Sequence, residues 1–199
     1  MDAYMCAVQT SPMDPALQLQ FRPVTDETRT DLSLFLQRNP AFRECSCMKW
    51  RLRSAVFMRM GSKERTGALK SLVAGGTPVG ILAYSNDVPV GWCSIAPRRG
   101  YRALEKSTGR GRIDDTRVWS VVCFFVDTHW RRKGISLRLL RAAVEYARIA
   151  GAKIVEGYPA APGARHHIQM GSFSTFRKAG FRDVTPPGGR QRIVQNVIG

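Results

Sequence analysis

A short basic segment with one glycine, Trp130 to Ser136, has the residue types of an anion-binding turn. It reads Trp-Arg-Arg-Lys-Gly-Ile-Ser, and a helical pattern begins directly after it. The first N–H groups of a helix have no partner within the helix, and the helix dipole adds positive charge there, so this end suits phosphate. Gly134 lets the backbone approach a ligand closely, and the small Ser136 leaves the first turn open. The segment therefore predicts a phosphate-binding turn.

The elements on either side of this turn would hold it in place. Val118 to Val126 is apolar and rich in valine and aromatic residues, which is typical of a strand buried on both faces. A helix is predicted from Leu137 to Gly151, and residues 153–158 return to an extended pattern. Its apolar face would consist of Leu137, Leu140, Val144 and Ala147. The order predicts a βαβ-like unit with a cationic turn, and the alternative is such a unit with a merely solvated turn.

Two common phosphate-binding motifs do not fit this turn, because it is neither G-x-x-x-x-G-K-[ST] nor G-x-G-x-x-G. Instead, Arg131-x-x-Gly134-x-Ser136 resembles [RQ]-x-x-G-x-[GA], the acyl-CoA loop of the GNAT superfamily of N-acyltransferases, with serine in the last small position. The later segment Phe176 to Phe181, which ends in Ala-Gly-Phe, resembles the close of that family's second motif. The resemblance spans roughly residues 19–184 and is most specific over residues 118–181.

The resemblance implies a mixed α/β (α+β) fold, with a central twisted sheet of six to seven strands flanked by about four helices. Two parallel strands would splay apart at the cofactor cleft. It also implies an N-acetyltransferase in which a primary amine directly attacks acetyl-CoA, the cosubstrate, in a ternary complex without a metal. The backbone of Phe124 and Val126 would bind the pantetheine. The pyrophosphate would lie against Arg131, Arg132, Lys133, Gly134, Ile135 and Ser136.

The resemblance also bears on the proton transfers. Many relatives carry a tyrosine as general acid in the last motif, where this sequence has Phe176, which has no proton to give. Tyr158, at the end of the second strand of the unit, is the best local substitute. Glu156, two residues earlier on the same strand face, would act as general base directly or through water, and an ordinary surface carboxylate is the alternative. For the whole domain, the alternative is a catalytically weak module that binds acyl-CoA or RNA.

An early segment, Cys45-x-Cys47 followed by Trp50, resembles a feature of one bacterial subgroup of the family. We expect Trp50 on the acceptor side, together with Trp92 from a predicted strand at residues 88–95. A core aromatic beside two small buried thiols is the alternative for Trp50. The acceptor itself stays open among a small amine, an aminoglycoside-like drug, a peptide terminus, a lysine and an aminoacyl-tRNA.

Composition sets further bounds on the chain. With 199 residues, 44% of them apolar, it predicts a single domain over residues 17–199 behind a loose leader at 1–16. Five scattered cysteines indicate reduced thiols rather than a disulfide framework, and no second pair completes a zinc site. No apolar run approaches the about 20 residues of a membrane span, and no signal peptide pattern is present. We expect a cytoplasmic monomer or homodimer.

The net charge of +16 implies an acidic partner, such as a nucleic acid or a polyphosphate cofactor. The alternative is an arginine-rich composition on a solvated surface. Residues 99–117 form a long polar connection, and long loops inside compact domains are often functional. We interpret this connection as a flap over the substrate, docked by Tyr101 and Leu104, and disorder is the alternative.

Overall fold

A computed structural model describes residues 17–107, 117–161, 168–189 and 191–199. The predicted leader at 1–16 and the middle of the predicted flap, 108–116, lie outside the described residues. The part of the flap that is described does dock as predicted, because Tyr101 and Leu104 are both buried.

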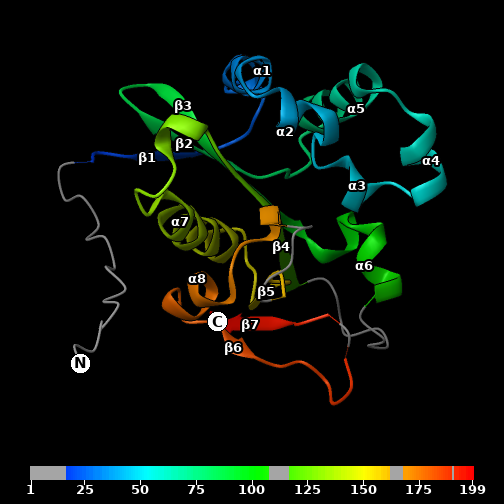
Figure 1. Ribbon diagram of the computed structural model, residues 1–199, viewed down its shortest axis with the longest axis vertical. Helices are drawn as coiled ribbons and strands as arrows, with labels where there is room; N and C mark the ends of the chain where they lie inside the picture. The colour runs from blue at the N-terminus through cyan, green and yellow to red at the C-terminus, as the bar shows by residue number, and fades with distance from the viewer. Residues whose placement is uncertain (1–16, 108–116, 162–167, 190) are drawn as a thin grey trace, which may run out of the picture.

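Seven strands form one sheet in the order β1-β2-β3-β4-β5-β7-β6 (Figure 1). Only β4 and β5 are parallel neighbours, and the other neighbouring pairs are antiparallel. This confirms the predicted mixed sheet. The strands are β1 Gln20–Pro23, β2 Ile81–Ser85, β3 Val88–Pro97, β4 Val118–Val126, β5 Ile154–Gly157, β6 Arg182–Asp183 and β7 Val194–Val197.

The described residues form eight α-helices, more than the about four that the sequence predicts. Five of them have six residues or fewer. The chain before β2 breaks at Pro40 and at the left-handed Ser46 and Cys47, so it forms several short helices. The helices are α1 Arg29–Arg38, α2 Pro40–Cys45, α3 Met48–Arg51, α4 Ser54–Arg59, α5 Ser62–Ala74, α6 Arg102–Ser107, α7 Ile135–Ile149 and α8 Phe173–Lys178. No helix of the described part of the chain is long and apolar enough to cross a membrane.

The sheet separates two apolar clusters. On one face, α7 and α8 pack against β2 to β5 (Figure 1). On the other face, α1 and α2 cover β2 and β3 through residues such as Leu32, Phe35 and Phe42. The buried face of α7 is rotated from the predicted one and consists of Ile135, Leu139, Leu140, Ala143 and Ala147. Leu137 is not part of this face because it lines a cleft at the start of the helix.

Strand β4 carries an irregularity that determines which side chains reach each face. Ser94 of β3 pairs with Cys123, but Ile95 pairs with Val121, so Val122 is an extra residue on β4. Val122 and Cys123 consequently both pack on the α1 side, whereas Phe124 turns to the α7 side. The pairing of β4 with β5 ends at Val121 and Gly157, so the two parallel strands separate beyond it, as predicted.

Candidate active site

A cleft of about 740 Å³ opens beside β4, where β4 and β5 separate. Its walls are the end of β4, the basic turn, the start of α7, and α8 with the segment before it. Of the eight predicted cofactor-binding residues, seven line this cleft: Phe124, Val126, Arg131, Arg132, Gly134, Ile135 and Ser136. The eighth, Lys133, instead places its ammonium group 4.9 Å from the centre of the Trp130 ring.

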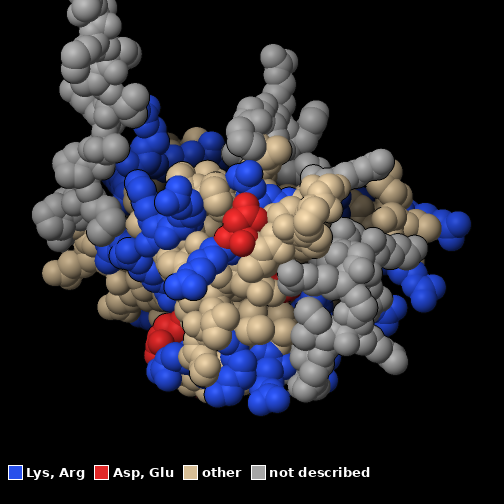
Figure 2. Space-filling model, turned by 90° about the horizontal axis from the view of Figure 1, so that it is seen from below, with Lys and Arg blue, Asp and Glu red and all other residues tan. Residues whose placement is uncertain are grey.

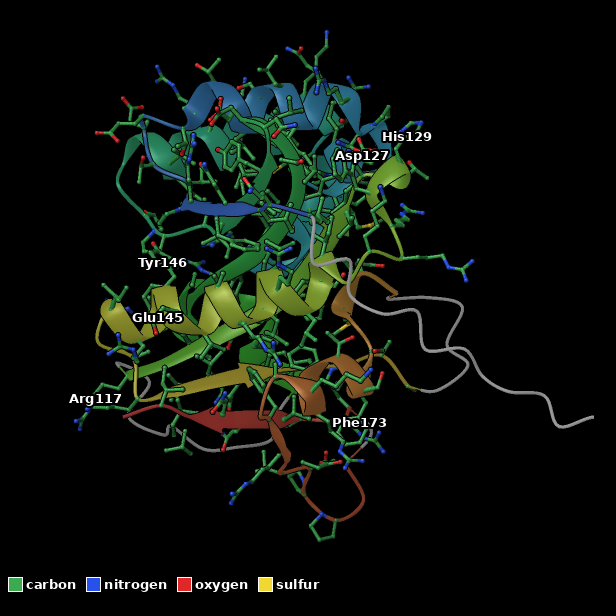
Figure 3. The ribbon with its side chains drawn as sticks, turned by 90° about the vertical axis from the view of Figure 1, so that its left-hand side faces the viewer. Arg117, Asp127, His129, Glu145, Tyr146 and Phe173 are labelled. Atoms are coloured by element: carbon green, nitrogen blue, oxygen red, sulfur yellow. The ribbon has the colours of Figure 1, made fainter. Side chains whose placement is uncertain are left out.

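The basic turn has the backbone form that an anion site requires. Arg132 and Gly134 have φ values of 64° and 73°, and Gly134 caps the N-terminus of α7. The N–H groups of residues 134–136 have no acceptor within the described part of the chain. Asp127 anchors the preceding turn by accepting a hydrogen bond from the His129 N–H at 3.1 Å. Figure 3 shows Asp127 and His129 together at the opposite end of α7 from Glu145 and Tyr146.

The electrostatic character of the cleft is positive. Among the residues that the structure describes, its lining includes Arg131, Arg132 and Lys178 but no carboxylate. Arg141 on the outer face of α7 donates to the carbonyl of Lys178 at 3.1 Å, which ties α7 to α8. Figure 2 shows Lys and Arg side chains across one face of the molecule, with few Asp or Glu among them. This charge suits a polyphosphate ligand, and the nucleic-acid partner stays a prediction.

Tyr158 and Glu156 share one face of the sheet, as their spacing predicts, and they are in direct contact. The Tyr158 hydroxyl donates to Glu156 Oε2 at 2.8 Å, and Gln195 Nε2 donates to Oε1 at 2.6 Å. Arg98 Nη1 lies 3.5 Å from Oε2. Tyr158 and Glu156 are each 1% exposed, so Glu156 is not an ordinary surface carboxylate. Neither residue lines the cleft, and both pack on the α1 side of the sheet at the point where β4 and β5 separate.

The contacts of this pair favour different roles for its two members. Burial, and next the charge of Glu156, raise the pKa of Tyr158 well above its ordinary value. The Ser120 hydroxyl lies 3.2 Å from the Tyr158 oxygen and can donate to it while Tyr158 donates to Glu156. The Glu156 carboxylate meanwhile also accepts a hydrogen bond from Gln195 Nε2 and lies beside the Arg98 guanidinium, so it is held in place next to the phenol. The arrangement is that of a phenol oriented by a carboxylate.

The two predicted acceptor-side tryptophans occupy different environments. Trp92 is completely buried on the interior strand β3, where it packs 5.7 Å from the Phe42 ring and donates its N–H to Cys47 Sγ. It has no surface left to offer an acceptor, because helices cover that face of β3. Trp50 on α3 is half-buried and packs against the same cluster, so it retains an exposed part.

Sequence reasoning assigned no role to several cleft residues. Ser174, Thr175 and Lys178 of α8 line the cleft, and so do Gln169 and Gly171 before this helix. Ser172 caps this helix by accepting a hydrogen bond from the Thr175 N–H at 3.2 Å. The spacing of these three α8 residues, which places them on one face of the helix, is the sequence signal that could have indicated their place in the cleft. No cluster of three or more metal-ligating side chains occurs among the residues that the structure describes.

The mixed sheet with its splayed parallel pair agrees with the fold that the sequence predicts. The family model of the acetyltransferase (GNAT) family matches residues 46–167, and the chain belongs to this family. No curated protein sequence matches the chain.

Solved structures share the fold at low sequence identity. The protein yncA of Salmonella typhimurium, with its cofactor acetyl-CoA, is 15% identical at a TM-score of 0.54 and covers 91% of this chain and 94% of its own. A ribosomal-protein-alanine N-acetyltransferase from Brucella melitensis is 19% identical, with a TM-score of 0.54. The match covers 89% of this chain and 99% of that protein. The aminoglycoside acetyltransferase AAC(6')-Ib, in complex with coenzyme A and kanamycin, is 18% identical, with a TM-score of 0.57. The match covers 90% of this chain and 95% of that protein.

Proposed function

We propose that this protein transfers the acetyl group of acetyl-CoA to a primary amine by direct attack in a ternary complex. The observation that carries the proposal is the cleft beside the splayed strands, with a basic helix-capping turn as part of its wall. Its volume of about 740 Å³ lies within the usual range for cofactor pockets. Two solved proteins of the same fold hold acetyl-CoA or coenzyme A.

The residues present fit acetyl-CoA as cosubstrate. The stretch of β4 beyond Val121 is not paired with β5, so its backbone can hydrogen-bond the amides of the pantetheine. The N–H groups of residues 134–136, with Arg131 and Arg132, suit the pyrophosphate. Lys178 of α8, which also lines the cleft, adds a third cation.

The chemistry then requires little from the protein beyond orientation and one proton. The amine nitrogen forms a bond to the thioester carbonyl carbon, the C–S bond breaks, and the nitrogen loses a proton to solvent water. In our proposal Tyr158 gives a proton to the departing thiolate, and Glu156 orients the phenol. Phe176, where relatives carry a tyrosine, is completely buried against Phe124 and Phe181 and has no proton to supply.

A screen of amine acceptors with acetyl-CoA, in which the release of free thiol is measured, tests the proposal. We expect acetyl-CoA alone to raise the melting temperature, because a ligand that binds only the folded protein stabilises it by mass action. We also expect at least one class of amine to accelerate thiol release above the rate without acceptor. A melting shift without thiol release from any amine would favour a binding module over an enzyme.

Tyr158→Phe tests the proton donor. Coenzyme A is acidic enough to leave as a thiolate, so loss of the donor should lower kcat by on the order of 10²-fold, the low end of acid–base effects. The Kd for acetyl-CoA should change little, because the proton is needed only as the C–S bond breaks and not in the bound thioester. The variant also loses two buried hydrogen bonds, with Glu156 and Ser120, each about 1 kcal/mol, so rates should be compared well below the melting temperature.

Tyr146→Phe is the matched control for this variant. Tyr146 is a half-buried tyrosine on α7 whose ring packs 5.4 Å from that of Trp119, away from Glu156. The Tyr146→Phe variant should have the same kcat as the parent protein. Parental kcat in Tyr158→Phe would mean that water protonates the thiolate and that Tyr158 only packs.

A further inference from the structure

Helix α4, Ser54–Arg59, exposes apolar side chains instead of burying them. None of its residues is buried, and Val56 and Met58 are 43% and 76% exposed. Met58 is the most exposed large apolar side chain in the part of the chain that the structure describes. Figure 1 shows α4 at the outer edge of the molecule, beyond α3 and α5. Exposed apolar residues that stand alone are ordinary, so the surroundings of α4 decide whether this surface has a function.

The helix is fixed from behind, so this surface is a defined projection. Phe57, between the two exposed side chains, packs against the apolar cluster under α1 and α2. The Arg65 guanidinium of α5 lies 4.0 Å from the centre of the Phe57 ring, and its Nη2 donates to the Phe57 carbonyl at 2.9 Å. Its Nη1 donates to the carbonyl of Glu44 in α2 at 2.7 Å. Arg65 therefore ties α4 to α2 and α5 while Val56 and Met58 stay exposed.

Exposed cations flank the apolar residues of α4. Residues 49–63 contain five arginine or lysine residues and no carboxylate. Four of these cations are exposed: Lys49, Arg53, Arg59 and Lys63. None of the four forms an ion pair with a carboxylate among the described residues. Arg53 precedes α4 and Arg59 ends it, and a six-residue helix is only about 9 Å long, so both charges lie close to Met58.

Another exposed apolar residue lacks this setting. Ile149, at the end of α7, is 72% exposed. Arg148 beside it donates two hydrogen bonds to the Glu145 carboxylate, at 2.8 and 2.6 Å, so the local charge is neutralised. Ile149 is thus an isolated surface residue of the ordinary kind. What distinguishes α4 is the combination of exposed apolar side chains with cations that no described carboxylate neutralises.

We propose that α4 and its flanking cations form a docking surface for an anionic lipid bilayer. Val56 and Met58 enter the boundary between headgroups and acyl chains, and Lys49, Arg53, Arg59 and Lys63 lie against the anionic headgroups. The net charge of +16 attracts the whole protein to the same surface. Docking requires neither acetyl-CoA nor an acceptor, so it goes beyond the proposed acetyltransferase function and is tested apart from it.

Other occupants fit this surface less well. A second copy would bring the same cations together, and such like-charge contacts disfavour a dimer. A single-stranded nucleic acid stacks its bases on exposed aromatic rings, whereas the Arg65 guanidinium occupies a face of the Phe57 ring. A bound peptide requires a groove or a free strand edge, whereas Met58 stands on a projection. An apolar projection among cations matches an anionic bilayer.

Co-sedimentation of the full chain with lipid vesicles tests the proposal. We expect binding to vesicles of phosphatidylglycerol and phosphatidylcholine in equal amounts, weakening as salt rises, and little binding to phosphatidylcholine alone. A protein of this net charge can adsorb through any basic region, so the contact must be located. The tryptophan emission of Met58→Trp should shift to the blue when the mixed vesicles are added. Ile149→Trp, at the matched exposed position, should show no such shift beyond that of the parent.

Two pairs of variants measure the apolar and the charged contributions. Met58→Asp should weaken binding to the mixed vesicles by on the order of tenfold or more, and Ile149→Asp should bind like the parent. Arg53→Ser combined with Arg59→Ser should weaken binding by on the order of 30-fold, because each cation at an anionic surface contributes about fivefold. The control, Arg177→Ser with Arg182→Ser, removes the same charge from α8 and β6, which lie away from α4 in Figure 1, and should have a much smaller effect.

The outcomes separate a specific surface from general adsorption. Equal losses in the two aspartate variants, equal losses in the two arginine pairs, or no blue shift in Met58→Trp would each overturn the proposal. Tighter binding to a single-stranded RNA than to the mixed vesicles, unaffected by Met58→Asp, would instead assign the cations to nucleic acid. All of the substituted side chains are exposed, so the variants should unfold at nearly the parental temperature.

Discussion

Gly134→Asp should weaken acetyl-CoA binding by on the order of 10²-fold or more. Gly134 caps α7 in a left-handed conformation, with φ of 73°, and lines the cleft. A carboxylate there would face the pyrophosphate, and such like-charge contacts cost several kcal/mol. Because each 1.4 kcal/mol is a factor of ten in Kd, the loss reaches at least two decades. Isothermal titration with acetyl-CoA measures it directly.

Gly151→Asp is the control that separates charge from backbone strain. Gly151 follows the other end of α7 with φ of 87°, and no heavy atom lies within 4 Å of the position a Cβ would take. The same substitution carries a similar conformational cost there, and aspartate is among the residues that tolerate this conformation. Gly151→Asp should lower stability slightly and bind acetyl-CoA like the parent. Equal affinity in the two variants would refute the assignment of the turn to the pyrophosphate.

Gly157→Ala should lower the free energy of unfolding by about 2–3 kcal/mol, which for a domain of this size reduces the melting temperature by roughly 5–10 °C. Gly157 is the last residue of β5, and a Cβ on it would overlap the Phe176 ring. That ring is completely buried between Phe124 and Phe181 and cannot move without displacing α8. Since α8 lines the cleft, acetyl-CoA affinity should fall as well.

Two further variants make this prediction specific. Gly67→Ala, in the interior of α5 with no heavy atom within 4 Å of its Cβ position, should be neutral or stabilise by up to about 1 kcal/mol. Phe176→Leu should be less costly in the Gly157→Ala background than in the parent, because the two side chains compete for one space. Unchanged denaturation midpoints in Gly157→Ala would show that α8 does not pack as tightly as described.

The sequence by itself determined the features that depend on near neighbours in the chain. The buried strand Val118–Val126, the helix predicted from Leu137, which begins two residues earlier at Ile135, and the turn between them follow from periodicity and from one glycine at a helix start. Their order, with the motif at Arg131 to Ser136, was sufficient for the family and for the mixed sheet. Seven of the eight predicted cofactor residues line the cleft, since they all belong to this continuous unit.

Only the tertiary structure decided which of the remaining residues can act. The extra residue, Val122, reverses the side of the sheet toward which each later side chain of β4 points. No local sequence pattern indicates such an irregularity. Pairing across the sheet buries Glu156 beside Arg98 and Gln195, and helices from the first third of the chain cover Trp92. These arrangements depend on contacts between residues distant in the sequence, and such contacts leave no periodic signal in either segment alone.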